Sequence, residues 1–386
     1  MTENEKNALL PAGLRDVLPG DAAFEAKIVE EIVMFFGLNG YDRVKAPLIE
    51  FEDGLLSGAG VALAPQTFRL MDPVSQRMMG VRADITPQIA RIARTRLGRT
   101  ARPLRLSYAG EVLRVRGSQL RPERQIMQVG AELIGSASPS ADTEIIELAA
   151  DTIGALGISE FSVDLAVPRL VPSILGQYGL SDDDAAAVRA ALDRKDPEAV
   201  KSVAGAATDT LAALLAVTGS VDSAMEKLNN LSLPETAKAE RERLEVVVSR
   251  LKNARSDLRL TLDPVENRGF EYHTGIGFTI FARGISGELA RGGRYRVQGS
   301  IDDEAGERAT GVTLYVDTIL GMLPKKQESQ RILVPGSTPR DVKSDLQRQG
   351  WITVSALDDQ VDLASEAGQL SCSHFMGKSG PEPVKG

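Results

Sequence analysis

The sequence predicts an α+β fold in which helices flank a mixed, mostly antiparallel sheet. Apolar residues recur at helical spacing near the N-terminus, and they alternate with polar residues between positions 104 and 134. Residues 181–255 differ from both segments, because they are rich in Ala, Asp, Glu, Leu and Lys. These three observations indicate a sheet domain that is interrupted by a helical insertion.

The first expected element is a helix, whose apolar face runs from Phe24 to Phe35 at spacings of four, four and three residues. Asp21 can cap its start, and Gly37 and Gly40 end it. The next elements are expected to be a strand over residues 41–49, a Gly- and Ala-rich loop to residue 64, and a helix over residues 86–97.

Residues 104–134 predict two antiparallel strands that are connected by a polar loop. In the second strand, apolar residues at every odd position from 127 to 133 share one face. The opposite face carries Gln128 and Glu132, which point the same way because they are an even number of residues apart. In an otherwise apolar strand these side chains line a pocket, pair with other groups or belong to a solvated outer face of the sheet.

The rest of the chain divides into the helical insertion, the end of the sheet domain and a small C-terminal unit. The insertion covers about residues 175–255, with Ser181 as a helix cap and Pro197 as a break. We therefore expect a core domain over residues 1–330 and a shortened α/β domain over 331–386. The further elements expected in the core are strands over 257–263 and 277–281 and a helix over 316–322.

The composition excludes several classes of protein. Among 386 residues there are one cysteine and two histidines, which exclude a disulfide framework and a thiolate metal cluster and leave little for a multi-histidine metal site. We expect neither a metal nor a cofactor. The longest uncharged stretch has 15 residues, short of the roughly 20 that a membrane-spanning helix needs. The N-terminus lacks the apolar segment of a secretory signal, which favours a cytoplasmic protein without a membrane partner. The net charge of −8 argues mildly against nucleic acid as the main partner.

Arginine is concentrated between residues 82 and 124, where eleven Arg and no Lys stand beside three acidic residues. Arg without Lys suggests bidentate recognition of a carboxylate or phosphate, although a basic helix face with salt bridges explains the pattern as well. The helix-face alternative fits Arg91, Arg94, Arg99 and Arg102. The candidates for ligand binding are Arg82, Arg114 and Arg116.

Two short motifs, RGFEYHTG over residues 268–275 and RGGRY over 291–295, follow the insertion. Paired glycines allow another chain segment to approach closely, and an Arg beside them can reach an anion. Alone, such a motif more often marks a bulge than a binding site.

Taken together and in this order, the motifs resemble the class II catalytic core of histidyl-tRNA synthetase. The resemblance covers about residues 9–323, and it implies a class II antiparallel sheet core that forms a homodimer through the motif around Pro47. It rests on LPAGLRDVLP (10–19), GYDRVKAPLIE (40–50), RADIT (82–86), the strand pair between Arg114 and Glu132, RGFEYHTG and GGRY.

The resemblance also implies a site for L-histidine. Asp84 and Thr86 match the residues that hold the α-amino group, and Arg114 matches an arginine that binds substrate carboxylate and phosphate. Gln128 and Glu132 match residues that contact the amino acid and its imidazole.

The histidine-specific signature of the family adds three residues to this site. Arg268 and Tyr272 match the signature, whereas His273 stands where the family has a second Tyr. A neutral histidine can still donate to or accept from an imidazole. A buried core histidine would look the same in the sequence.

Three substitutions depart from the synthetase pattern, because Arg116 replaces a Glu that helps to bind ATP, Thr318 replaces an Arg that stacks on the adenine, and Arg296 replaces an Asp. A Thr hydroxyl cannot replace a planar charged group, so ATP activation is expected to fail and no catalytic residue is predicted. The tail over residues 331–386 is about half as long as an anticodon-binding domain. It contains 6 Lys and Arg and 7 Asp and Glu, and this net charge of −1 is unfavourable for binding the phosphate backbone of RNA.

The motifs of the amino-acid pocket are retained and those of the ATP site are lost. This combination resembles the regulatory subunit family of ATP phosphoribosyltransferase. This resemblance implies a subunit without catalysis of its own, which activates a short-form ATP phosphoribosyltransferase catalytic subunit and mediates feedback inhibition by L-histidine. Two alternatives remain open. One is a histidyl-tRNA synthetase with a degenerate ATP site and a shortened tail, and the other is a tRNA- or amino-acid-sensing domain without an enzyme partner.

Overall fold

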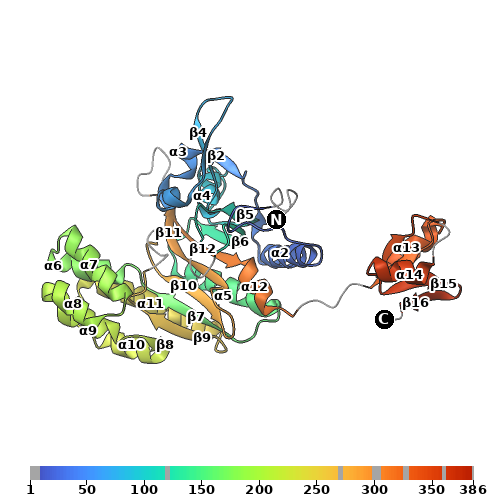
Figure 1. The fold of residues 1–386 in the computed structure, drawn as a ribbon. Coiled ribbons are helices and arrows are strands. Elements are labelled where there is room, and N and C mark those ends of the chain that lie inside the picture. The colour runs from blue at the N-terminus through green and yellow to red at the C-terminus, as the bar shows by residue number, and fades with distance from the viewer. Residues whose placement is uncertain are drawn as a thin grey trace. The chain divides into compact units, whose positions relative to one another are not determined.

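A nine-stranded mixed sheet forms the centre of the larger part of the chain (Figure 1). The computed structural model describes residues 9–117, 122–267, 273–297, 306–324, 330–358 and 362–384. The chain divides into two units, Met1–Leu323 and Pro324–Gly386. In these described segments, no helix is both long enough and apolar enough to cross a membrane.

The strand order in the large sheet is β1-β5-β6-β12-β11-β10-β7-β9-β8. Neighbouring strands are antiparallel except in the pairs β1–β5 and β7–β9, so the predicted mixed, mostly antiparallel sheet is confirmed. The strands are β1 (Asp42–Arg43), β5 (Leu104–Leu113), β6 (Gln125–Ile134), β7 (Phe161–Ala166), β8 (Gly219–Ser220), β9 (Arg259–Asp263), β10 (Gly277–Ala282), β11 (Ala290–Val297) and β12 (Glu307–Tyr315).

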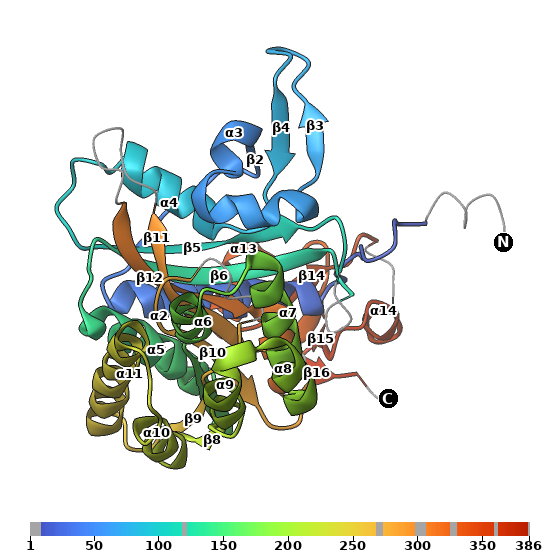
Figure 2. The same ribbon diagram turned by 90° about the vertical axis from the view of Figure 1, so that its left-hand side faces the viewer.

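Helices cover both faces of this sheet, and Figure 2 shows α4 and α2 on opposite sides of β5 and β6. Three helices, α2, α5 and α12, pack on one face and share one large apolar core with it. On the other face, Ile89 of α4 joins Tyr108 and Tyr295 in a second core. The four helices are α2 (Asp21–Leu38), α4 (Thr86–Thr95), α5 (Pro139–Ala155) and α12 (Val316–Met322).

The first helix lies where the pattern predicts it, but its cap and buried face differ from the prediction. Gly20 is the N-cap and Asp21 is the first helical residue, so Asp21 does not cap α2. Phe24 and Phe35 are only partly buried, because the buried face of α2 is rotated by about one residue from the predicted face. The buried residues of α2 are Ile28, Val29, Ile32, Val33 and Phe36.

Residues 41–49 do not form the single strand that their pattern predicts. Only β1 and β2 (Ile49–Phe51) are strands there, and they belong to different sheets. Pro47 lies between them and has no N–H group with which to continue a ladder. The smaller sheet has the order β2-β4-β3 and is accompanied by β3 (Arg69–Met71), β4 (Met78–Val81), α3 (Glu52–Leu55) and the 3₁₀ helix η1 (Gly58–Gln66).

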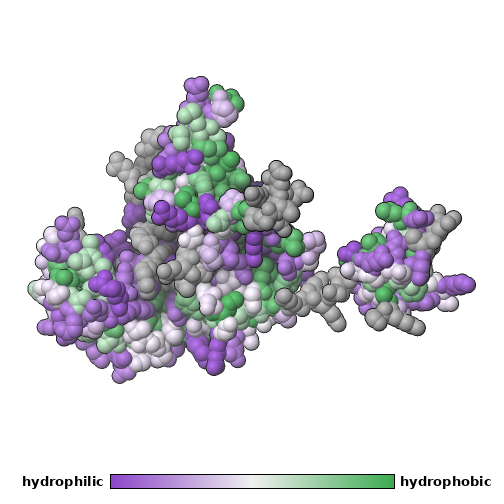
Figure 3. Space-filling view, in the orientation of Figure 1, coloured by the Kyte–Doolittle hydropathy of each residue, from purple (hydrophilic) through white to green (hydrophobic). Residues whose placement is uncertain are grey.

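Several large apolar side chains are exposed on or beside this smaller sheet. Leu48 is 50% exposed, Phe51 is 38% exposed and Met71 is 63% exposed. Figure 3 shows hydrophobic residues gathered on the part of the first unit that carries β2 and β4. Large exposed apolar patches on a folded chain mark sites of association.

The predicted helical insertion lies between β7 and β9. Ser181 caps α7 as expected, since its hydroxyl accepts a hydrogen bond from the Asp184 N–H, and Pro197 begins α8. Within the insertion, β8 returns to pair with β9, which no local pattern indicated. The insertion contains α6 (Leu170–Tyr178), α7 (Asp182–Asp193), α8 (Pro197–Val203), η2 (Gly205–Ala207), α9 (Thr208–Leu215), α10 (Val221–Asn229) and α11 (Glu235–Ala254).

The second unit has its own four-stranded sheet, in the order β14-β13-β15-β16. Leu333, Ala356, Ala367 and Cys372 form a core there, so the single cysteine is a buried packing residue. The elements of this unit are β13 (Arg331–Val334), α13 (Arg340–Arg348), β14 (Ile352–Ser355), α14 (Leu363–Gln369), β15 (His374–Gly377) and β16 (Gly380–Pro383).

Candidate functional site

Gln128 and Glu132 of β6 lie under the start of α4, where 0% and 1% of their surfaces are exposed. They share one face of the strand, as their even spacing predicts. The alternative of a solvated sheet face is therefore wrong at these two positions. Buried polar side chains of this kind need hydrogen-bond partners.

The Glu132 carboxylate is held from two sides. Its Oε1 accepts a hydrogen bond from the Thr86 hydroxyl at 3.0 Å, and its Oε2 accepts one from the Tyr295 hydroxyl at 2.9 Å. Burial raises the pKa of this carboxyl to about 8, against the lowering effect of the two hydrogen bonds. Gly311 lies opposite Glu132 in the ladder, and a Cβ atom there would collide with the carboxylate.

Gln128 fixes the position of Asp84. The Gln128 Nε2 donates to Asp84 Oδ2 at 2.9 Å, and the Gln128 Oε1 accepts from the Ile85 N–H at 3.2 Å. The other Asp84 oxygen, Oδ1, accepts from the Thr86 N–H at 2.9 Å. Both carboxylates predicted for the site are thus anchored at the first turn of α4.

A chain of hydroxyl groups continues from Thr86 across the sheet. The Thr86 hydroxyl lies 3.3 Å from the Tyr108 hydroxyl, which lies 2.8 Å from the Thr313 hydroxyl. Tyr108 is fully buried, and burial is the main cause that raises the pKa of its phenol well above the usual value. Sequence reasoning missed Tyr108 and Thr313, because neither stands in a recognisable motif.

These side chains border a pocket of about 200 Å³, part of which is open to solvent. Of the predicted site residues, Thr86, Glu132 and His273 line it. Asp84 and Gln128 are not in the lining, but Asp84 accepts a hydrogen bond from the Thr86 N–H and Gln128 donates one to Asp84. His273 is 7% exposed, and a Cβ atom at Gly293 would lie 2.6 Å from its ring. The other residues of the lining are Arg291, Gly292, Gly293, Tyr295, Gly311, Val312 and Thr313.

The remaining predicted residues lie elsewhere. Arg114 is half-buried next to the site, where its Nε donates to the Ala83 carbonyl at 3.3 Å, but it is not part of the lining. Arg268 and Tyr272 lie outside the described residues.

The motif GGRY forms the middle of β11 without a bulge, since Gly292 and Gly293 keep their register with β12. The prediction that its Arg reaches an anionic ligand is wrong for Arg294. That side chain is 1% exposed on the opposite face of the sheet, where its Nε lies 2.9 Å from Asp142 Oδ1 of α5. Burial raises the pKa of Asp142, and the Arg294 charge opposes that shift. Tyr295 of the motif instead lines the pocket, where its hydroxyl donates to Glu132.

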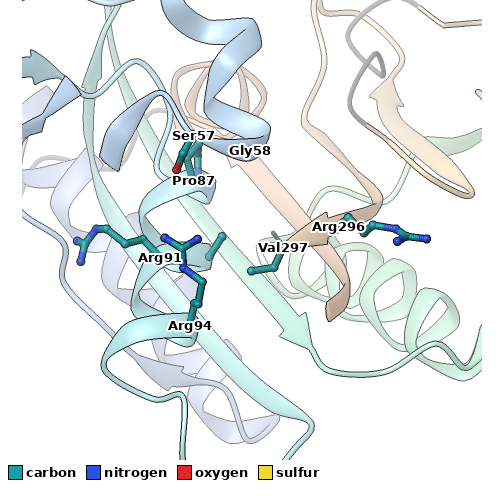
Figure 4. Close-up of a pocket in the computed structure, with 8 residues that line it drawn as sticks. Ser57, Gly58, Pro87, Arg91, Arg94, Arg296 and Val297 are labelled. Carbon is teal, nitrogen blue, oxygen red and sulfur yellow. The ribbon is translucent and has the colours of Figure 1, made fainter. Parts of the chain in front are cut away.

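Several other arginines of the rich segment make structural contacts. Arg82 is buried and donates to the carbonyls of Glu111 at 2.7 Å and Ala46 at 3.1 Å. Arg91 pairs with Glu50, with 2.8 Å between its Nε and the carboxylate. Figure 4 shows Arg91 and Arg94 on α4 at a second hollow, with Arg296 pointing away from both.

The three positions that depart from the synthetase pattern have different surroundings. Thr318 is buried in α12, whereas the side chains of Arg116 and Arg296 are exposed. Among the described residues, no group of three or more His, Cys, Asp and Glu side chains could hold a metal ion.

Comparison with known proteins identifies the family. Residues 13–319 match the histidyl-tRNA synthetase family. The chain is 52% identical over 380 residues to the ATP phosphoribosyltransferase regulatory subunit of Paramagnetospirillum magneticum, with 98% of this chain and 99% of the relative covered. The protein of the same name from Rhodospirillum rubrum is 46% identical, with 97% of this chain and 96% of the relative covered.

Solved structures have the same fold. An ATP phosphoribosyltransferase regulatory subunit/histidyl-tRNA synthetase from Bacillus halodurans C matches with a TM-score of 0.81 at 25% identity, over 94% of this chain and 96% of that one. A chain of the ATP phosphoribosyl transferase complex from Thermotoga maritima matches with a TM-score of 0.59 at 18% identity, over 76% of this chain and 97% of that one. The chain belongs to the ATP phosphoribosyltransferase regulatory subunit family and is built on a histidyl-tRNA synthetase-like class II core.

Proposed function

We propose that this chain senses L-histidine in the pocket beside Glu132 and controls a short-form ATP phosphoribosyltransferase catalytic subunit in the cytoplasm. The observation that carries the proposal is the buried Glu132 carboxylate, held by Thr86 and Tyr295 at the wall of a small pocket. A buried carboxyl at a pocket wall is stabilised in its charged form by a ligand that donates hydrogen bonds. The imidazole N–H of histidine is such a donor.

The α-amino and carboxylate groups of the ligand contact residues at and near the start of α4. In this arrangement, Asp84 and Thr86 hold the α-amino group, and Gln128 keeps the Asp84 carboxylate in place. His273 offers a ring nitrogen from the opposite wall. Arg114, which lies beside Ala83, and Arg268 neutralise the ligand carboxylate.

We expect this subunit to have no catalysis of its own. Thr318 is buried and carries no charge, so it cannot stack on adenine or neutralise phosphate as an arginine does. The rival function, a histidyl-tRNA synthetase, requires histidine-dependent exchange of pyrophosphate into ATP. Detectable exchange by the purified chain would favour that rival.

The proposed control works through differential affinity. Histidine inhibits only if it binds one state of the complex more tightly than the other, with a coupling free energy of about 1–3 kcal/mol. The test mixes this chain with a short-form catalytic subunit that is poorly active alone. We expect activity to appear on mixing and to fall when histidine is added, and a mixture that stays inactive would contradict the proposal.

We also propose that the chain forms a homodimer through its class II core. Leu48 and Phe51 present exposed apolar surface beside Pro47, and such surface is stabilised when a second copy covers it. Sedimentation of the wild-type chain should give a dimer, whereas Leu48→Glu should shift it towards monomer. A wild-type chain that sediments as a monomer at micromolar concentration would contradict the dimer.

A further inference from the structure

Arg291 of β11 lines the same pocket as Glu132. Side chains alternate between the two faces of a strand, so Arg291 shares its face with Gly293 and Tyr295, which also belong to the lining. Among the described residues of this lining, Arg291 is the only arginine, whereas Arg114 lies beside the site without lining it.

The register of the sheet places Arg291 across the pocket from Glu132. Gly293, two residues further along β11, stands opposite Gly311 of β12, and Gly311 stands opposite Glu132 of β6. Neighbouring strands are about 4.8 Å apart, so roughly 10 Å separates β6 from β11. Because the two glycines carry no side chains, the Glu132 carboxylate and the Arg291 guanidinium border the same space.

Arg291 is already engaged by a carboxylate of the chain. Its Nη2 donates to Glu288 Oε1, and the two side chains are 25% and 17% exposed. Glu288 follows Gly287, which adopts a φ of 103° that favours glycine, in the turn between β10 and β11. The backbone of Leu289 fixes this turn, since its N–H donates to β10 at 2.8 Å and its carbonyl accepts from β12 at 2.9 Å. The pocket wall thus holds a guanidinium that is paired with a carboxylate.

Opposite charges lie on different sides of the pocket. The carboxylates of Glu132 and Asp84 belong to β6 and to the approach to α4, whereas Arg291 belongs to β11. An amino acid carries both kinds of charge. Its ammonium group suits the acidic side, and its carboxylate suits the guanidinium, which binds carboxylates through paired N–H donors.

We propose that Arg291 binds the α-carboxylate of the ligand directly and thereby selects an amino acid over the corresponding amine, while Glu288 competes for the same guanidinium. The inference rests on the proposed function, because it concerns the pocket assigned to histidine. On binding, the ligand carboxylate takes the place of the Glu288 carboxylate at Arg291. Arg114 contributes positive charge from beside the site.

The experiment compares two ligands, L-histidine and histamine, which lacks the carboxylate, by calorimetric titration of the full chain. We expect the wild-type chain to bind histidine more tightly than histamine. Arg291→Gln should weaken histidine binding about tenfold or more, the loss of one charge-assisted contact, and should leave histamine binding no weaker. Arg283→Gln, at an exposed arginine that follows β10, is the matched control and should bind both ligands as the wild type does.

A second variant, Glu288→Gln, separates ligand contact from a merely structural role. Because it removes the competing carboxylate, it should strengthen histidine binding without strengthening histamine binding. An ion pair that only holds the turn predicts the opposite, namely that Arg291→Gln and Glu288→Gln each weaken the binding of both ligands. That result would overturn the proposal, and so would undiminished histidine binding in Arg291→Gln.

Arg291→Lys provides the test if Arg291→Gln does not fold. Lysine keeps the charge but lacks the planar pair of donors, so histidine should lose part of its advantage over histamine, and an unchanged advantage would contradict the role of Arg291. A wild-type chain that binds neither ligand would overturn the proposed function and this inference with it. Equal wild-type affinity for histidine and histamine would overturn the role of Arg291 alone.

Discussion

The Tyr295 hydroxyl donates a hydrogen bond of 2.9 Å to Glu132 Oε2, although the two residues are 163 positions apart in the sequence. The contact crosses from β11 to β6 over β12, where Gly311 leaves room for it. Tyr295 of β11 and Thr86 of α4 therefore hold the carboxylate, and Gly311 of β12 leaves the space that it fills.

Replacing Glu132 by Ala should weaken histidine binding. The variant removes the acceptor for the imidazole and leaves the Thr86 and Tyr295 hydroxyls without their carboxylate partner. Calorimetric titration with histidine measures the effect, and we expect a loss of affinity of about tenfold or more. Glu245→Ala, at an exposed position of α11, is the control and should bind as the wild type does. Undiminished binding in Glu132→Ala would contradict the assignment of the pocket.

The stability of the chain should depend on pH through Glu132. Burial raises its pKa from the ordinary value of 4.5 to about 8, so between these pH values the folded chain holds a proton that the unfolded chain has lost. The proton contributes its full stabilisation below pH 4.5, the ordinary pKa that the carboxyl has in the unfolded chain. This contribution falls as the pH rises and is lost as the pH passes the folded-state pKa of about 8. Urea unfolding from about pH 5 to pH 8 should show this decline in the wild type and a flatter profile in Glu132→Gln. Parallel profiles in the two proteins would rule out a buried, protonated Glu132.

Gly311→Ala should damage the pocket without changing any polar group. The added methyl group collides with the Glu132 carboxylate, which must move away from Tyr295. We expect a destabilisation of about 1–3 kcal/mol together with weaker histidine binding. Gly176→Ala makes the matched comparison, because space is open around Gly176 in α6 and the change should stabilise the helix by about 0.5–1 kcal/mol. Histidine binding that is unaffected in Gly311→Ala would show that the carboxylate position is unimportant.

Arg294→Leu should lower the free energy of unfolding more than a substitution at any exposed arginine does. Arg294 and Asp142 are a buried pair with side chains 1% and 2% exposed, so removal of the cation leaves a buried carboxylate uncompensated. The expected cost is about 3–5 kcal/mol in the free energy of unfolding. Arg348→Leu, which breaks an exposed pair with Asp345, should cost less than about 1 kcal/mol. Similar losses in both variants would mean that burial does not decide the strength of the pair.

Much of the architecture follows from local patterns. The alternation over residues 104–134 predicts β5 and β6, the apolar spacing predicts α2 and α4, and the composition of residues 181–255 predicts the insertion helices. These predictions are confirmed because helical and strand periodicities depend on nearby residues. The strand predicted over residues 41–49 is wrong, since Pro47 ends the ladder and the two halves pair with different sheets.

By itself, the sequence determined that Gln128 and Glu132 share one face of a strand and that Ser181 caps a helix. Only the tertiary structure decided that this face is buried, that Tyr108, Tyr295 and Thr313 complete the polar network, and that Arg294 turns away from the pocket to Asp142. The reason is physical. The spacing of residues along one strand sets which side chains share a face, but sheet register and helix packing join segments more than a hundred residues apart. No local pattern carries that information.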